Sequence, residues 1–456
     1  MKVDALVAEI GSTTTVINAF DKLDSENPKF IGSGYSPTTV LEGDVTIGLN
    51  NAISMLCKKL NVKNLDAKET FASSSAAGGL KMSVHGLVYD MTVKAAKEAA
   101  LGAGANIKMI TSGLLDDYQI DEIKTSPLNI IMIAGGVDFG ERTTAIENSK
   151  KIASLKLNIP VIYAGNIQNQ NIIKNIFKEN NQLEYLFISK NVYPKIDVLE
   201  VDESRKIIQD VFEKHIIHAP GMEKVKSVIK ENIIPTPGAV MEASILLKES
   251  IGDLVTIDIG GATTDIHSVT EGKAEIEKIL IAPEPFAKRT VEGDLGVYIN
   301  KDNIIEMITK ERLIRKLNLN ENDYNKIIEN YKPIPINGQI PLTEELAKEA
   351  MIQSIERHSG RLIDMYTGSG KTTYAEGKDL TNVKYIIATG GALTRLPNKL
   401  TIIKEALSKK NSKILKPDEK TQVLIDQDYI MASIGVLSKK HPEAALKILK
   451  NSLGIE

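Results

Sequence analysis

The sequence is poor in cysteine, in net charge and in long apolar runs. Of its 456 residues only Cys57 is a cysteine, which excludes an intramolecular disulfide. Lysine and arginine total 56 against 59 aspartates and glutamates, so no general attraction to nucleic acid is expected. No stretch approaches the roughly 18 apolar residues that cross a bilayer, and the first residues lead into a strand instead of a signal peptide. We therefore expect a cytoplasmic protein whose partners are proteins and nucleotides, with no nucleic acid or membrane among them.

The most informative motif lies at residues 255–267, which read VTIDIGGATTDIH. A β-branched run predicts a buried strand, and Asp258 near its end can hold a hydrated divalent metal ion. Glycines after the strand let backbone N–H groups approach an anion, and threonines add hydroxyl donors. The predicted phosphate ligands are Gly260, Gly261, Thr263 and Thr264. The sequence thus predicts a strand–turn–strand phosphate site, with a simple tight turn as the alternative.

The N-terminus repeats this pattern at residues 5–17, which read ALVAEIGSTTTVI. Glu9 stands where the first motif has Asp258. The donors predicted for the turn are Gly11, Ser12, Thr13 and Thr14. Two copies in one chain suggest two similar halves that bind one nucleotide.

A third motif, at residues 385–393, reads YIIATGGAL. It predicts a strand that enters a glycine turn before a helix. Such a turn can lie flat against an adenosine through Gly390, Gly391 and Ala392, although packing at a helix entry could also require it.

These motifs, in this order, resemble the actin-like ATPase superfamily, which includes actin, sugar kinases and the seventy-kilodalton heat-shock chaperones. The segments at 72–80, 99–105, 134–140 and 234–240 narrow the resemblance. They are similar to the accessory proteins encoded beside glutamate mutase, often called the MutL or GlmL family, which is unrelated to the mismatch-repair protein of similar name. The resemblance spans essentially the whole chain. It implies an ATP-dependent accessory or reactivating chaperone for an adenosylcobalamin-dependent mutase of the glutamate mutase or ornithine aminomutase type.

The resemblance also implies a fold and a site. The fold is α/β, a duplicated actin-like (ribonuclease H-like) ATPase with an inserted parallel α/β module. ATP and Mg²⁺ are the implied cofactors, with Glu9 and Asp258 as catalytic carboxylates that hold the metal through water, and with Asp265 orienting its loop or only capping a turn. Relatives usually have aspartate where Glu9 stands. The extra methylene leaves the hydrolysis rate open, and a slow ATPase is expected.

Alternating strand and helix patterns divide the chain into segments. Strands are predicted at 130–134, 160–164 and 185–189, and the charge-rich stretch 300–360 is predicted to be a helical lid. The expected segments are a first half at 1–128, the inserted module at 129–232, a hinge helix at 233–250, a second half at 251–425, and a crossing helix with a terminal helix at 426–456.

Several other motifs are better explained by structural roles than by catalysis or binding. Gly368–Thr373 looks like the end of a P-loop but has Met365 where glycine is needed, so we predict a surface loop. Asp138 could contact a ligand or the partner enzyme, but its position favours a helix-capping or loop-stabilising role. Two sets of residues lack the neighbours that a metal site or a serine nucleophile needs: the histidines His215 and His218, and the serines Ser73, Ser74 and Ser75.

Three other functions compete with that of a mutase accessory protein. ATP-driven dehydratase activators share the fold, but they hold an iron–sulfur cluster with two cysteines per chain, whereas Cys57 is single and fits a packing role. A small-molecule kinase would need a base aimed at an acceptor hydroxyl. An actin-type filament or scaffold is the other alternative. The mutase served and the oligomeric state, including a possible homo-oligomer, are not determined by the sequence.

Overall fold

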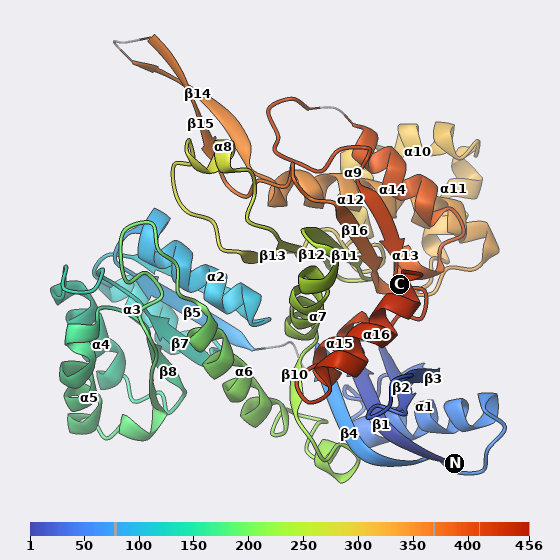
Figure 1. Ribbon diagram of the computed structural model, residues 1–456, viewed down its shortest axis with the longest axis horizontal. Helices are drawn as coiled ribbons and strands as arrows, with labels where there is room; N and C mark the ends of the chain where they lie inside the picture. The colour runs from blue at the N-terminus through green and yellow to red at the C-terminus, as the bar shows by residue number, and fades with distance from the viewer. Residues whose placement is uncertain (77–79, 368–369, 410, 456) are drawn as a thin grey trace. The chain divides into compact units, whose positions relative to one another are not determined.

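A computed structural model describes residues 1–76, 80–367, 370–409 and 411–455. Parts of the 72–80 motif and of the P-loop-like segment lie outside the described residues. The chain forms two compact units (Figure 1). Unit 1 contains Met1–Ala243 and Ala432–Ile448, and unit 2 contains Ser244–Met431 and the residues from Leu449.

Unit 1 begins with a five-stranded sheet in the order β10-β4-β1-β2-β3. The strands are β1 (Lys2–Ile10), β2 (Thr14–Asp21), β3 (Lys29–Pro37), β4 (Asp66–Ser74) and β10 (Ile233–Pro235). The first three are antiparallel, while β4 runs parallel to β1 and β10 runs parallel to β4. Helix α1 (Val45–Lys59) starts where the Asp44 side chain accepts the Thr46 N–H, and it buries Leu49 and Leu56 in the core.

Unit 2 contains a sheet with the same strand order, β13-β12-β11-β16-β17. Its strands are β11 (Leu254–Ile259), β12 (Thr264–Val269), β13 (Ala287–Glu292), β16 (Tyr385–Thr389) and β17 (Gln422–Ile425). Three antiparallel strands are again followed by two parallel ones. The duplicated α/β architecture predicted from the repeated hairpin motif is therefore confirmed.

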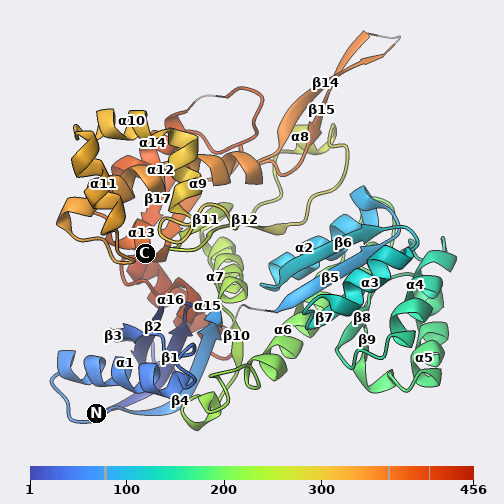
Figure 2. The ribbon, with the colours of Figure 1, turned by 180° about the vertical axis from the view of Figure 1, so that it is seen from behind.

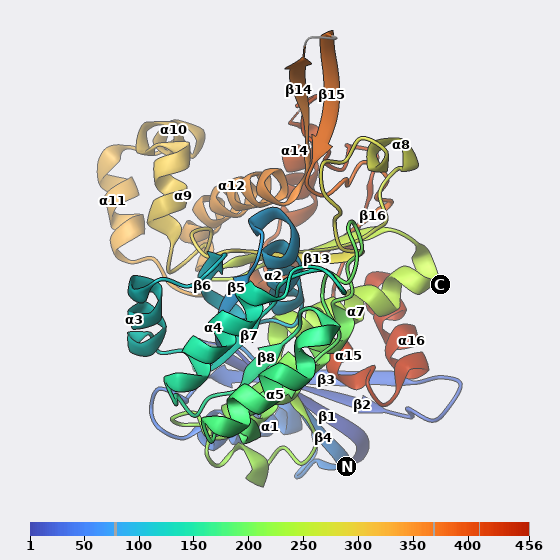
Figure 3. The same cartoon turned by 90° about the vertical axis from the view of Figure 1, so that its left-hand side faces the viewer.

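The remainder of unit 2 is mainly helical. The stretch expected to be a helical lid forms α9 (Lys301–Ile308), α10 (Lys310–Lys316), α11 (Glu321–Glu329) and α12 (Ile340–His358), and three short helices lie elsewhere, α8 (Ala274–Glu277), α13 (Gly390–Arg395) and α14 (Lys399–Ser408). Residues 361–366 look helical in sequence but form β14 (Arg361–Thr367), which pairs with β15 (Gly370–Glu376). This hairpin extends away from the rest of unit 2 (Figure 3).

A second sheet in unit 1 forms the inserted module (Figure 2). All five strands are parallel, in the order β6-β5-β7-β8-β9. They are β5 (Lys81–Gly86), β6 (Asn106–Ser112), β7 (Ile130–Ile133), β8 (Val161–Tyr163) and β9 (Leu186–Ile188). The sheet therefore starts near residue 81, well before the expected boundary at 129.

The sequence did not predict strand β5, because this buried strand contains polar residues. The His85 ring nitrogens lie 2.8 Å from the Thr111 hydroxyl and 2.9 Å from the Ser83 hydroxyl. Burial lowers the pKa of His85 to about 3, so the ring is neutral. These hydrogen bonds allow polar residues to occupy a central strand. A central strand is normally recognised in a sequence by its apolar residues, and β5 lacks that pattern.

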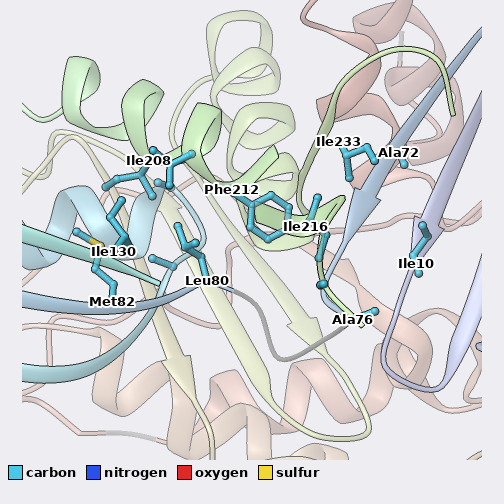
Figure 4. Packing of buried hydrophobic residues seen from close by; sticks show 14 of the residues in the cluster. Ile10, Ala72, Ala76, Leu80, Met82, Ile130, Ile208, Phe212, Ile216 and Ile233 are labelled. Carbon is cyan, nitrogen blue, oxygen red and sulfur yellow. The ribbon is translucent and has the colours of Figure 1, made fainter. Parts of the chain in front are cut away.

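Helices cover both faces of the module sheet. Helices α2 (Lys94–Gly102) and α6 (Asp202–Ile216) share a core with one face, and α3 (Asp117–Thr125), α4 (Thr143–Ser154) and α5 (Gln170–Glu179) share a core with the other. The first core contains Met82, Ile130 and Phe212 and continues to Ile10 and Ile233 of the first sheet (Figure 4). The module is thus packed into unit 1 and does not have a core of its own on that face.

Three helices contain the points where the chain passes from one unit to the other. Helix α7 (Thr236–Ile251) starts in unit 1 and ends in unit 2, whereas α15 (Met431–Leu437) starts at the end of a unit 2 segment and continues in unit 1. Helix α16 (Pro442–Leu453) follows, and its residues from Leu449 belong to unit 2. Helix α15 begins five residues later than expected because the buried Asp426 carboxylate accepts the N–H groups of Ile430 and Met431 and ends a turn there. None of the helices in the described ranges is long and apolar enough to cross a bilayer.

Candidate functional site

The turn between β1 and β2 is closed by one backbone hydrogen bond. The Gly11 N–H donates to the Thr14 carbonyl at 3.0 Å, and Ile10 and Thr15 are the cross-strand pair beneath it. A Cβ atom at Gly11 would lie 2.9 Å from that carbonyl oxygen. The close approach explains why this position is a glycine.

Thr38, just after β3, holds this turn from outside. Its N–H donates to the Thr13 carbonyl at 3.0 Å, and its hydroxyl donates to the Gly11 carbonyl at 2.8 Å. The carbonyl groups of Gly11, Thr13 and Thr14 are therefore occupied by protein donors. No protein acceptor within the described residues receives the N–H groups of Ser12 and Thr13, and both residues are exposed. Amides without a protein acceptor at an exposed turn are available to bind an anion.

The turn between β11 and β12 repeats this arrangement in unit 2. The Gly260 N–H donates to the Thr263 carbonyl at 2.9 Å. The segment 297–300 takes the remaining carbonyl groups: Tyr298 N–H donates to the Gly261 carbonyl at 2.9 Å, and the Asn300 amide donates to the Ala262 carbonyl at 2.7 Å.

Each unit thus presents a turn in which most carbonyls accept protein donors and two successive N–H groups have no protein acceptor among the described residues. In unit 2 the N–H groups of Gly261 and Ala262 have no protein acceptor among the described residues. The bracing segments come from different places, Thr38 after β3 in one unit and residues 297–300 after β13 in the other. The sequence identified neither Thr38 nor the segment 297–300, because the contacts that these residues make with the turns are long-range and mostly involve backbone groups.

Asp265 orients the second turn. Its carboxylate accepts the Thr263 hydroxyl at 3.1 Å and the Nε and Nη2 groups of Arg289 at 2.9 Å and 2.6 Å. Both partners of this ion pair are largely buried. Arg289, on β13, is a further residue that the sequence did not identify. In the first hairpin Val16 stands at the corresponding position, so that turn lacks the equivalent brace.

This difference predicts unequal effects of matched variants. Thr263→Val is expected to weaken nucleotide binding about tenfold, because it removes one hydroxyl ligand near a charged group. Asp265→Asn is expected to weaken nucleotide binding and also to lower the free energy of unfolding by about 3 kcal/mol, because it removes the negative charge that the buried Arg289 guanidinium contacts. MgATP titration and urea unfolding measure the two effects, and Thr14→Val, in the hairpin that has Val16, is the control for affinity without a stability loss. Equal stability of Asp265→Asn and wild type would contradict the bracing role.

The third motif packs directly on the second hairpin. Gly390 follows β16, has a φ of +83°, and a Cβ atom there would lie 2.3 Å from Asp258 Oδ1 and 2.7 Å from the backbone of Ile259. Gly391 is exposed, with open space around the position of its missing Cβ, and Ala392 is buried. Unit 2 therefore brings together Asp258, the 260–264 turn and the Gly390 turn.

The two predicted carboxylates occupy equivalent places in the two sheets. Glu9 is paired with Val16 across β1 and β2 and lies beside Ser73 of β4. Asp258 is paired with Asp265 and lies beside Thr389 of β16. Mg²⁺ is usually held by one or two carboxylates together with water and phosphate oxygens, so the chemistry of each of these acids, taken by itself, suits a nucleotide-bound metal.

The remaining predicted residues have structural surroundings. Asp138 accepts hydrogen bonds from the Ile167 N–H and the Asn191 amide, both at 2.9 Å, so it stabilises its loop. Across the described ranges no three His, Cys, Asp or Glu side chains gather as metal ligands, around His215 or elsewhere. Cys57 is buried in α1. Residues 370–373 of the P-loop-like segment belong to strand β15.

Comparison with known proteins places the chain in a family. A family model described as MutL protein matches residues 5–453. Protein MutL of Clostridium tetanomorphum is 37% identical over 462 residues, which cover 98% of each chain. Among solved structures, nucleotide-free acetone carboxylase is 11% identical at a TM-score of 0.42, over 96% of this chain and 70% of that one. A nucleotide-free diol dehydratase-reactivating factor is 10% identical at a TM-score of 0.35, over 96% and 100%. The full-length family match and the 37% identity show that this chain belongs to the MutL protein family.

Proposed function

We propose that this protein is an ATP-dependent accessory protein that reactivates an adenosylcobalamin-dependent mutase, of the glutamate mutase or ornithine aminomutase type. The observation that carries the proposal is the pair of matching turns, one in each unit, each with two successive N–H groups that have no protein acceptor among the described residues. A single turn of this kind could bind any small anion. Two turns of matching sequence suit the phosphates of one nucleotide, and membership of the MutL family supports the choice of partner.

Each part of the proposed site has one task. The turns 11–14 and 260–264 bind the phosphates through backbone N–H groups and hydroxyls, and the Gly390–Ala392 turn contacts the adenosine. Mg²⁺ supplies charge neutralisation for phosphoryl transfer, in which positioning and electrostatics dominate. Glu9 and Asp258 would hold the metal, with water between carboxylate and ion. Because Glu9 is longer by one methylene than the aspartate usual in the superfamily, we propose that hydrolysis is slow.

Nucleotide state is proposed to act through α7 and α15, which carry the chain between the units. A ligand shifts an equilibrium between conformations only by its difference in affinity for them. A nucleotide that takes ligands from both units has such a difference, because it favours the state in which both turns contact it. While the protein holds the mutase, this shift would let a damaged cofactor leave and an intact one enter.

Recovery of an inactivated mutase tests the proposal. The purified protein is titrated with MgATP and then incubated with inactivated glutamate mutase, or separately ornithine aminomutase, together with fresh adenosylcobalamin. Recovery of mutase activity is expected with ATP and not without it. Asp258→Asn is expected to weaken MgATP binding roughly thirtyfold, since a charge-assisted contact contributes about 2 kcal/mol, and to prevent recovery.

Other outcomes of the same experiment would replace the proposal. Absence of both MgATP binding and mutase recovery would end it. ATP turnover stimulated by a metabolite, without a protein partner, would indicate a small-molecule kinase. ATP-driven pelleting that depends on protein concentration would indicate a filament.

A further inference from the structure

One edge of the inserted module carries exposed apolar side chains on every loop. The loops follow the carboxyl ends of β5, β6, β7, β8 and β9, at residues 87–93, 113–118, 134–142, 164–169 and 189–200. Ile172 and Leu183 are exposed elsewhere in the module, but the most exposed large apolar side chains lie on these loops. Those at least half exposed are Tyr89, Leu114, Tyr118, Phe139, Ile167 and Ile196, which we call the apolar edge.

Hydrogen bonds join these loops into one surface. The Gly113 N–H donates to the Gly86 carbonyl at 2.9 Å, which links the β6 loop to β5. Asp138 links the loops that follow β7, β8 and β9. Its N–H donates to the Pro194 carbonyl, and its carboxylate accepts the Ile167 N–H, each at 2.9 Å. The apolar edge is therefore held in one arrangement, and a partner would lose little entropy in ordering it.

Phe139 is the least expected residue on this edge. It is 77% exposed and has a φ of +64°, the left-handed region that non-glycine residues seldom occupy. Its N–H donates to the Asn166 side chain at 3.3 Å, and the same Asn166 amide group donates to the Gly140 and Glu141 carbonyls. A strained backbone that displays a phenyl ring to solvent contributes nothing to the core. Such outliers collect at functional positions.

The strand order adds an independent indication. In the order β6-β5-β7-β8-β9 the connections reverse direction between β5 and β7. Open parallel sheets bind their ligands beyond the carboxyl ends of the strands at such a reversal. A π-helical turn, Tyr89–Val93, opens the helix after β5, and turns of this kind are frequent at functional sites. Both features lie on the loops that carry the apolar edge.

The charge of the loops restricts the partner. The five loops contain seven acidic residues, Asp90, Asp116, Asp117, Asp138, Glu141, Asp197 and Glu200, against three basic ones, Arg142, Lys190 and Lys195. An acidic rim repels nucleic acid and anionic membranes. It also repels a second copy of the same edge. A protein with an apolar patch surrounded by lysine and arginine is complementary.

We propose that the apolar edge is the docking surface for the client enzyme, with Phe139 as its central anchor. The proposal rests on the proposed function, since the client is the adenosylcobalamin-dependent mutase. The client surface that meets this edge is apolar at its centre and basic at its rim. Contiguous exposed apolar residues with a polar rim are typical of protein interfaces, and aromatic anchors contribute most of the binding energy there.

Phe139→Gly is the sharpest test, because glycine accepts the left-handed backbone and preserves the fold. The full-length variant is expected to bind purified glutamate mutase or ornithine aminomutase, whichever the wild type binds, roughly thirtyfold more weakly, as removal of a central anchor does. Its MgATP affinity and thermal midpoint are expected to be no lower than those of the wild type. Leu183→Ser, an exposed apolar residue away from the edge, is the matched control and is expected to bind normally. Asp197→Lys is expected to slow association at low salt, because it reverses a rim charge.

The outcomes separate two kinds of failure. Normal mutase binding by Phe139→Gly and by Tyr118→Ser would overturn the docking surface while the proposed function stands. A wild-type protein that binds MgATP but neither mutase would overturn the proposed function and, with it, the docking proposal. A Phe139→Gly protein that loses mutase binding while Leu183→Ser retains it supports the surface.

Discussion

Gly390→Ala is expected to destabilise unit 2 by about 3 kcal/mol and to abolish nucleotide binding, whereas Gly391→Ala leaves stability nearly unchanged. The first alanine would be forced into a left-handed backbone, which costs about 1–2 kcal/mol. Its Cβ would also lie 2.3 Å from Asp258 Oδ1 and 2.7 Å from the Ile259 backbone, and overpacking of this kind costs about 1–3 kcal/mol.

The loss of binding has a separate cause. The alanine methyl group must displace either Asp258 or the end of β11, and both lie at the base of the 260–264 turn. The proposed metal-binding carboxylate and the phosphate-binding amides would move together. Gly391 has open space at its missing Cβ and an ordinary backbone conformation, so an alanine there changes only the surface available to the adenosine.

Urea unfolding and MgATP titration of the two variants provide the measurement. The neighbouring glycines make a matched pair, because they differ in packing and backbone conformation but not in chemistry. If Gly390→Ala were as stable as wild type, the close approach of this turn to Asp258 would be wrong. If it lost stability but bound MgATP normally, the assignment of Asp258 and the 260–264 turn to the metal and the phosphates would be wrong.

The repeated hairpins were predictable because their chemistry is local. A strand, an acid, a glycine turn and hydroxyls lie within thirteen residues at 255–267, and their spacing alone predicts the turn. The groups that complete each turn come from elsewhere: Thr38, Arg289 and the segment 297–300 reach it through contacts that no short pattern records. The order of the five strands in each sheet likewise depends on pairings between distant segments.

The inserted module shows where periodicity misleads. Strand β5 contains Ser83 and His85, which satisfy each other inside the sheet, so the module was expected to begin at β7. Residues 361–366 look helical because apolar residues recur three and four positions apart, at Leu362, Met365 and Tyr366. They nevertheless form half of a hairpin, in which Asp364 makes an ion pair with Lys371 of the other strand. In both cases a tertiary or cross-strand partner decides the structure, and propensity does not.

The small residues of α15 account for the other large expected effect. Gly435 of α15 lies so close to α7 that a Cβ atom there would stand 1.7 Å from the Ala239 carbonyl oxygen and 2.5 Å from its carbon. Two positions earlier, Ser433 Oγ accepts the buried Asn18 amide at 2.9 Å. These contacts all lie within unit 1, and they hold α15 against α7 and the first sheet.

Gly435→Ala is therefore expected to lower the free energy of unfolding of unit 1 by about 3 kcal/mol or more, because helix backbones in contact cannot admit a methyl group without separating. The sign is informative: in a helix without this contact, glycine to alanine would stabilise by about 1 kcal/mol. Ser433→Ala is the graded control and is expected to cost about 1–2 kcal/mol through the unpaired Asn18. Urea unfolding followed by a unit 1 probe distinguishes them. A Gly435→Ala protein more stable than wild type would show that α15 and α7 do not meet at this position.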